Sequence, residues 1–202
     1  MVKLIGKNKI NCAVFISGRG SNLKSILKYS KKKSSKIIVK LVISNKCNVP
    51  GITFAKKKKI NFKIINYKNI KSAEKKIMNF LKKNKIKLVC LAGFMKILSK
   101  SFIRKFGNKI INIHPSLLPK YKGLNTHERA IKNNEKYSGC TVHFVNEKLD
   151  SGKIIIQKKI KILKNDTPKN LEKRILKEEN KLYPKAISKV LIRIWRKNLF
   201  LI

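Results

Sequence analysis

Asn112 and His114 stand two positions apart at the end of the apolar run KIINIH, and Pro115 and Pro119 follow them. Residues i and i+2 of a β-strand point to the same face, so the two side chains are predicted to point together. The prolines end the strand and stiffen the loop beyond it. The Asn112 amide can donate to a developing oxyanion, and the His114 imidazole can move a proton near neutral pH. A lone histidine is commonly structural, but open α/β sheets bind ligands at strand ends, which shifts the balance towards catalysis.

Asp150 is the third residue that suits this chemistry. The chain holds only nine acidic residues, and Asp150 lies in a loop opened by Ser151 and Gly152 directly before an apolar run. A carboxylate in that position can orient and charge an imidazole. A plain Asp-Ser-Gly turn is the alternative from these residues alone.

The segment ISGRGSNL, residues 16–23, has the features of an anion site. Gly18 and Gly20 permit a tight backbone, while Ser21 and Asn22 can cap a following helix. Several backbone N–H groups would then converge at a helix N-terminus. The spacing fits neither a dinucleotide fingerprint nor a P-loop, so a phosphate monoester is the expected ligand. An ordinary strand-to-helix turn is the alternative.

Metal and nucleophilic chemistry have no comparable support in the sequence. His127 and His143 lack metal-ligand spacing with His114, and the four cysteines form no C-x-x-C pair. We therefore expect no metal, and free thiols in a reducing cytoplasm. No Ser or Cys has a base placed to suggest a triad, so direct transfer without a covalent enzyme intermediate is the simplest mechanism.

The formal net charge of +42 raises the question of a nucleic-acid partner. Only six of the 51 basic residues are Arg, however, and the lysines are spread along the whole chain. Base-reading and phosphate-binding surfaces favour Arg. A solvated basic surface is therefore the favoured interpretation, and a nucleic-acid-binding protein is the alternative. No apolar run approaches membrane-spanning length, and the first residues lack the apolar region of a signal peptide.

Apolar runs alternate with amphipathic, lysine-rich segments over the first 114 residues. This rhythm predicts an α/β fold, with an open, mostly parallel, Rossmann-like sheet and helices on both faces. Two antiparallel strands and a long C-terminal helix should follow, with Thr167 as N-cap, Pro168 at N1, and a kink or division at Pro184. The predicted strands are 11–18, 36–44, 61–67, 87–94, 109–114, 139–145 and 152–162, and the predicted helices are 21–30, 72–85, 99–106, 125–134 and 166–198.

Four segments, SGRGSNL, LAGFMKILS, NIHPSLLPKYKG and GCTVHFVNEKLDSGKIIIQ, together resemble the glycinamide ribonucleotide formyltransferases of purine synthesis. The resemblance covers about residues 12–185 of one expected domain, 1–202, and leaves 186–202 as a helical tail. It implies transfer of a formyl group from the co-substrate 10-formyltetrahydrofolate to the amine of 5-phosphoribosylglycinamide. The implied mechanism is direct attack through a tetrahedral intermediate, without a metal.

The resemblance also implies roles for individual residues. Asn112, His114 and Asp150 match the catalytic trio, in which Asp150 would raise the pKa of His114 and place its ring. The residues that match the ribonucleotide site are Gly20, Ser21, Asn22 and Glu179. The residues that match the folate wall are Met95, Lys96, Ile97 and Leu98, together with Asn112, and the supporting residues are Thr141 and His143. In place of an Arg that meets the folate tail in many members, the chain offers Lys68 or Lys71.

Two related enzymes are the rivals. Methionyl-tRNA formyltransferases share a similar HPSLLP core but typically add a C-terminal domain, and formyltetrahydrofolate deformylases usually carry an extra N-terminal domain. We expect neither domain here, and we expect a cytoplasmic monomer or homodimer whose partners are its two small-molecule substrates, with no membrane and no specific nucleic acid.

Overall fold

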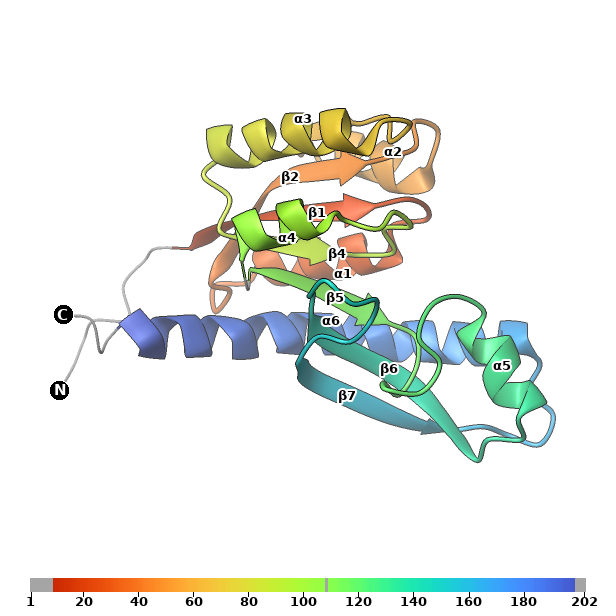
Figure 1. Cartoon of the computed structure of the whole chain (residues 1–202). Coiled ribbons are helices and arrows are strands. Elements are labelled where there is room, and N and C mark those ends of the chain that lie inside the picture. Colours follow the sequence, from red (N-terminus) through yellow and green to blue (C-terminus); the bar gives the residue numbers. More distant parts are fainter. Residues whose placement is uncertain (1–8, 108, 199–202) are drawn as a thin grey trace, which may run out of the picture.

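A computed structural model describes residues 9–107 and 109–198. Its centre is a seven-stranded sheet with the strand order β3-β2-β1-β4-β5-β6-β7 (Figure 1). The strands are β1 Ile10–Ile16, β2 Ile37–Ser44, β3 Phe62–Ile64, β4 Leu88–Leu91, β5 Ile110–His114, β6 Tyr137–Phe144 and β7 Ile154–Lys161. The helices are α1 Ser21–Ser30, α2 Pro50–Lys57, α3 Ile70–Lys83, α4 Lys100–Phe106, α5 Thr126–Lys132 and α6 Pro168–Asn198.

The first five strands pair in parallel, and β6 and β7 are antiparallel to their neighbours. The chain winds outward from β1 to β3 and then returns to place β4 on the other side of β1. Such a reversal of strand order opens a crevice between the loops that follow the two central strands. The predicted fold class, an open and mostly parallel sheet with antiparallel C-terminal strands, is confirmed.

Alternation along β1 explains why both faces of the sheet are covered. Val14 and Ile16 pack in a core with α1, α2 and α6, whereas Ala13 and Phe15 pack in a second core with α3 and α4. A strand that is buried on both sides reads as a continuous apolar run, as the segment CAVFI does.

The helix α6 runs the length of the molecule beside α1 and the antiparallel strands (Figure 1). It begins as predicted, because the Asn170 N–H bonds to the Thr167 hydroxyl and Pro168 occupies the first turn. Of the kink or division predicted at Pro184, the division is wrong, since α6 is one helix to Asn198, and the kink stays a prediction. Proline removes the hydrogen bond to the carbonyl four residues earlier. Here that carbonyl, of Asn180, accepts instead from the Ser25 hydroxyl of α1.

Other boundaries also differ from the sequence prediction. The strands β3 and β4 are shorter than predicted, because the chain leaves the sheet for the loops that frame the crevice. Helix α2 was not predicted, although Pro50 at its first turn is a typical start signal. The end of the predicted helical tail, 199–202, lies outside the described residues. No helix among the described residues is long and apolar enough to cross a membrane.

Candidate active site

The register of β5 against β6 brings four polar side chains into two adjacent pairs. Asn112 lies opposite His143, and His114 lies opposite Thr141. His114, Thr141 and His143 are buried, while Asn112 is half-buried. Residues about thirty positions apart in the sequence therefore share one strand end.

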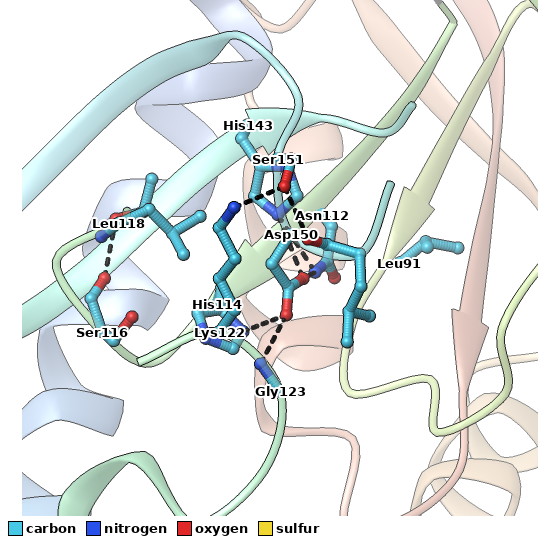
Figure 2. A network of polar contacts seen from close by, with 12 residues as sticks. Leu91, Asn112, His114, Ser116, Leu118, Lys122, Gly123, His143, Asp150 and Ser151 are labelled. Carbon is cyan, nitrogen blue, oxygen red and sulfur yellow. Dashed lines mark hydrogen bonds and ion pairs between the residues drawn. The ribbon is translucent and has the colours of Figure 1, made fainter. Parts of the chain in front are cut away.

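Asp150 completes this cluster from the loop between β6 and β7 (Figure 2). Its Oδ2 lies 3.3 Å from His114 Nδ1 and accepts from the Gly123 N–H at 3.0 Å. Its Oδ1 lies 3.6 Å from His143 Nε2 and 3.5 Å from Asn112 Nδ2. The structure thus brings together Asn112, His114 and Asp150, as the family resemblance implies.

The backbone of Asp150 is left-handed, with φ of 44°. Non-glycine residues adopt this conformation at an energetic cost, and Asp is among those that tolerate it. The next residues explain how the loop stays close to the sheet. A Cβ at Gly152 would stand 1.6 Å from the Phe144 carbonyl oxygen, so only glycine fits there. The loop is consequently pressed against the end of β6, with Asp150 facing both histidines (Figure 2).

Burial and charge act in opposite directions on this cluster. Burial raises the pKa of the Asp150 carboxyl, but its contacts with His143, Gly123 and His114 outweigh burial and leave that pKa below its ordinary value. Burial lowers the pKa of His114, and the Tyr121 carbonyl and the Asp150 charge oppose it without overcoming it. Asp150 acts in the predicted direction, yet the net pKa of His114 is lowered rather than raised.

The hydrogen-bond partners indicate where the imidazole protons lie. His114 Nε2 is 2.8 Å from the Tyr121 carbonyl oxygen, which only accepts, so Nε2 carries a proton. His114 Nδ1, beside Asp150, is then the atom that gains or loses a proton. His143 Nδ1 likewise donates to the Phe144 carbonyl oxygen at 2.8 Å. Neutral His143 can therefore accept at Nε2 from Asn112 Nδ2 at 3.3 Å, whereas protonated His143 would direct the same nitrogen's N–H at Asp150 Oδ1, which lies 3.6 Å away.

Thr141 fixes the loop that follows β5. Its hydroxyl donates to the Ser116 carbonyl at 2.7 Å and accepts from the Leu118 N–H at 3.1 Å. Gln157 of β7 adds two bonds, one to that hydroxyl at 2.8 Å and one to the Leu118 carbonyl at 2.7 Å. Sequence reasoning missed Gln157, because nothing in the strand pattern shows which polar side chain faces the loop.

The predicted anion site lies beyond β1 at the start of α1. Gly20 is the N-cap residue, has φ of 72°, and no side chain caps the helix. The N–H groups of the first turn therefore have no partner within the helix, and no acidic residue occupies that turn. A Cβ on Gly20 would lie 2.7 Å from the Cα of Gly51 in the unpredicted helix α2, which explains the need for glycine.

Glu179 of α6 lies beside this helix end, as the resemblance implies. Its Oε2 accepts from Asn22 Nδ2 at 2.8 Å, and both residues are buried. The Asn22 Oδ1 atom is buried without a partner in the structure. Burial raises the pKa of Glu179 to about 7, with the nearby Glu172 charge adding to the rise. The site therefore holds a carboxyl that is partly protonated near neutral pH.

The segment Met95–Leu98 forms the loop between β4 and α4. Met95 and Ile97 are largely exposed, whereas Leu98 is anchored in the core. The loop starts with a bond of 2.8 Å from the Met95 N–H to the Ser17 hydroxyl, at the end of β1. Ser17, which sequence reasoning did not single out, thus ties the two sides of the crevice together.

A groove lies at the end of β3, beside the start of α3. It is lined by Ile64, Ile65, Asn66, Lys68, Asn69, Ser72, Ala73 and Lys76. Of the two lysines suggested by the sequence, Lys68 lines this groove and Lys71 does not. Across residues 9–107 and 109–198, no group of three or more His, Cys, Asp or Glu side chains has the arrangement of a metal site.

Comparison with known proteins agrees with this geometry. Residues 10–187 match the family model described as formyl transferase. The chain therefore belongs to the formyl transferase family, whose co-substrate is a formyl-folate.

The individual relatives are more specific. The chain is 40% identical over 178 residues to the phosphoribosylglycinamide formyltransferase of Haemophilus influenzae, covering 87% of this chain and 84% of that protein. It is 42% identical over 187 residues to a trifunctional purine biosynthetic protein of Homo sapiens, covering 91% of this chain. The chain spans only 18% of the length of that human protein.

Solved structures give the same result. The phosphoribosylglycinamide formyltransferase of Anaplasma phagocytophilum matches with a TM-score of 0.84 and 41% identity, covering 89% of this chain and 85% of that one. The corresponding Brucella melitensis protein matches with a TM-score of 0.86 and 36% identity, covering 91% and 96%.

The charge on Asp150 should be measurable at His114. In Asp150→Asn, the pKa of His114 is expected to fall further below its ordinary value, because the carboxylate charge that opposes burial is lost. NMR of ¹⁵N-labelled imidazoles suits the chain, which has only three histidines. Asp166→Asn, at the start of α6, is the matched control and should leave the His114 titration in place. An unchanged or higher pKa in Asp150→Asn would contradict the assigned contact.

The buried carboxyl of Glu179 should make stability depend on pH. Its pKa is raised on folding, so its favourable contribution is complete below the ordinary value and is lost as pH rises through about 7. The unfolding free energy of Glu179→Gln minus that of wild type should therefore increase by about 2 kcal/mol between about pH 5 and pH 8. Urea titrations at several pH values measure this, with Glu178→Gln as the control. A difference in unfolding free energy that is the same at all pH values would refute the raised pKa of the buried Glu179 carboxyl.

Proposed function

We propose that this protein transfers the formyl group of 10-formyltetrahydrofolate to the amine of 5-phosphoribosylglycinamide, giving the formylated ribonucleotide and tetrahydrofolate in purine synthesis. The observation that carries the proposal is the cluster of Asn112, His114 and Asp150 at the same edge of the sheet as an uncapped helix N-terminus. The three side chains could carry out an acyl transfer, and the helix N-terminus suits a sugar phosphate. Relatives of similar length that carry this activity in their names support the same choice.

The ribonucleotide is proposed to bind along α1. Its phosphate would meet the N–H groups at the start of that helix, near Gly20, Ser21 and Asn22. The ligand would also reach the buried pair of Asn22 and Glu179, where the Asn22 carbonyl oxygen has no partner in the structure. An amine or hydroxyl of the ligand would satisfy that oxygen.

The folate is proposed to bind across the crevice, against Met95, Lys96, Ile97 and Leu98. The exposed Met95 and Ile97 side chains offer apolar contacts, and the loop backbone offers hydrogen bonds. Lys96 is exposed, so its backbone rather than its charge would make the contact. The negatively charged tail of the folate would extend to the groove that Lys68 lines.

The proposed reaction is direct attack of the glycinamide nitrogen on the formyl carbon. Holding both substrates in line would supply much of the rate. Asn112 would donate to the tetrahedral oxyanion and contribute about 3 kcal/mol by analogy, and protonated His114 would stabilise the oxyanion by its positive charge. The carbon–nitrogen bond to the folate then breaks as His114 Nδ1 gives its proton to the folate nitrogen, and the neutral Nδ1 atom then takes up the proton lost by the amine. Asp150 would hold that ring and stabilise its charged form, while Thr141 and His143 keep the surrounding loop and Asn112 in place.

Acceptor choice tests the function directly. The donor 10-formyltetrahydrofolate is offered with glycinamide ribonucleotide, with charged initiator tRNA, or with water alone. Transfer is expected only to the ribonucleotide. His114→Ala should lower turnover about a hundredfold or more, because a general acid–base group contributes on that scale. Ribonucleotide affinity, measured by calorimetry, should change little. Preferred transfer to tRNA or to water, or wild-type turnover in His114→Ala, would refute the proposal.

The two candidate lysines for the folate tail can be separated by substitution. Lys68→Ala should raise the KM for a donor with a charged tail about three- to tenfold, because an exposed charge contact is modest. Lys71→Ala is the control. It also removes one positive charge near the start of α3, but Lys71 does not line the groove. The difference should disappear with a donor that lacks the charged tail. Equal effects of the two substitutions would place the tail elsewhere.

A further inference from the structure

Glu74 is a buried acid that the proposed mechanism does not use. It lies on α3, on the opposite side of the sheet from α1 and α6, and only 7% of its surface is exposed. Among the described residues, Glu179 is the other acidic residue whose whole-residue exposure is this low, and it lies in the proposed ribonucleotide site. A carboxylate is costly to bury unless its oxygens are bonded, so the partners of Glu74 identify what it holds.

Both oxygens of Glu74 are directed at one residue, Ser99. Oε1 accepts from the Ser99 backbone N–H at 2.7 Å, and Oε2 accepts from the Ser99 hydroxyl. The same hydroxyl accepts from the Phe102 N–H at 3.1 Å and so caps α4. Because two bonds to one residue fix orientation as well as position, Glu74 determines where the loop ends and α4 begins.

The loop from Met95 to Ser99 is therefore tied by polar contacts at both ends, and Leu98 adds an apolar anchor next to the second tie. At its start, the Met95 N–H bonds to Ser17, whose hydroxyl donates to Asn45 Oδ1 at 2.5 Å. At its end stands the contact with Glu74. Between these ties, 66% of Met95 and 73% of Ile97 are exposed. Exposed apolar side chains thus lie on a segment that polar contacts hold at both ends.

We propose that Glu74 is a positioning residue for folate binding, which acts through Ser99 to hold the Met95–Leu98 wall in its binding conformation. This inference rests on the proposed function, because it assigns that wall to the formyl donor. A wall that is fixed before the ligand arrives loses less entropy on binding. Weakening the tie at Ser99 therefore costs affinity for the donor, whereas the ribonucleotide site and the His114 cluster, to which the Ser99 side chain makes no bond, stay unaffected.

The substitution Glu74→Gln isolates the contact. The amide oxygen of Gln can still accept from the Ser99 N–H, but its nitrogen cannot accept from the Ser99 hydroxyl. The KM for 10-formyltetrahydrofolate is expected to rise about tenfold, with kcat and the KM for the ribonucleotide within about twofold of wild type. The double variant Glu74→Gln/Ser99→Ala should be no worse than the poorer single variant, because both remove the same interaction.

Glu147→Gln is the matched control. Glu147 pairs at the surface with Arg104 of α4, so its substitution removes a carboxylate contact to the same helix without touching the loop. It should leave all three kinetic constants unchanged. Thermal unfolding of each variant separates a binding effect from a loss of fold. As a second readout, amide hydrogen exchange at Ser99 and Phe102 is measured in the truncated variant Glu74→Ala, which removes the contact with Ser99 altogether.

The outcomes distinguish this inference from the function beneath it. If wild-type protein does not transfer formyl groups from 10-formyltetrahydrofolate, the proposed function fails and the inference fails with it. If wild type is active but Glu74→Gln retains the wild-type KM for the donor, the inference alone is overturned. It is also overturned if both KM values and kcat change together with a lowered melting temperature, since Glu74 would then only stabilise the fold.

Discussion

The contact of the Asp150 carboxylate with His114 and His143 is the interaction on which the site depends. It joins a loop residue in a left-handed conformation to two strands whose register places the histidines side by side. Burial by itself lowers the pKa of His114, and it would raise the pKa of an isolated Asp150 carboxyl. Placed together, His114 and Asp150 each support the charged form of the other, which lowers the pKa of Asp150 and partly offsets the effect of burial on His114.

The scarcity of acidic residues makes their location informative. The chain has nine acidic and 51 basic side chains, so most of its surface is positive whatever the function. Asp150, Glu179 and Glu74 are nevertheless withdrawn from that surface, and each bonds to groups around the crevice between β1, β4 and β5. Substitution of exposed positions by lysine costs little stability, whereas replacing a buried carboxylate that has bonded partners costs much more. The charge of the chain and the chemistry of its site are therefore largely separate matters.

The sequence was sufficient for those parts that local rules govern. Continuous apolar runs indicated strands covered on both sides, and the segment with Gly20, Ser21 and Asn22 indicated a strand-to-helix turn with free N–H groups. The i and i+2 spacing put Asn112 and His114 on one side of a strand end. What the residues alone left open was whether Asp150 reaches them, because that depends on the antiparallel return of β6 and β7 and on the close approach that Gly152 permits.

Features set by distant packing could not be read from the sequence. Helix α6 accommodates Pro184 because Ser25 of α1 bonds to the carbonyl that the proline leaves unbonded. The tie at Ser99 depends on Glu74 of α3. The net pKa of His114 depends on burial, which a motif does not report. In each case a polar atom meets a partner that lies close only after the chain has folded.

A crystal structure of the protein with glycinamide ribonucleotide and an unreactive folate analogue tests the central claim most directly. We expect the phosphate on the N–H groups at the start of α1, the folate ring against the Met95–Leu98 loop, and the acceptor nitrogen within about 4 Å of the His114 ring, with the Asp150 contact retained. A complex in which the reacting atoms lie away from Asn112, His114 and Asp150, or in which the phosphate binds elsewhere on the basic surface, would contradict the account.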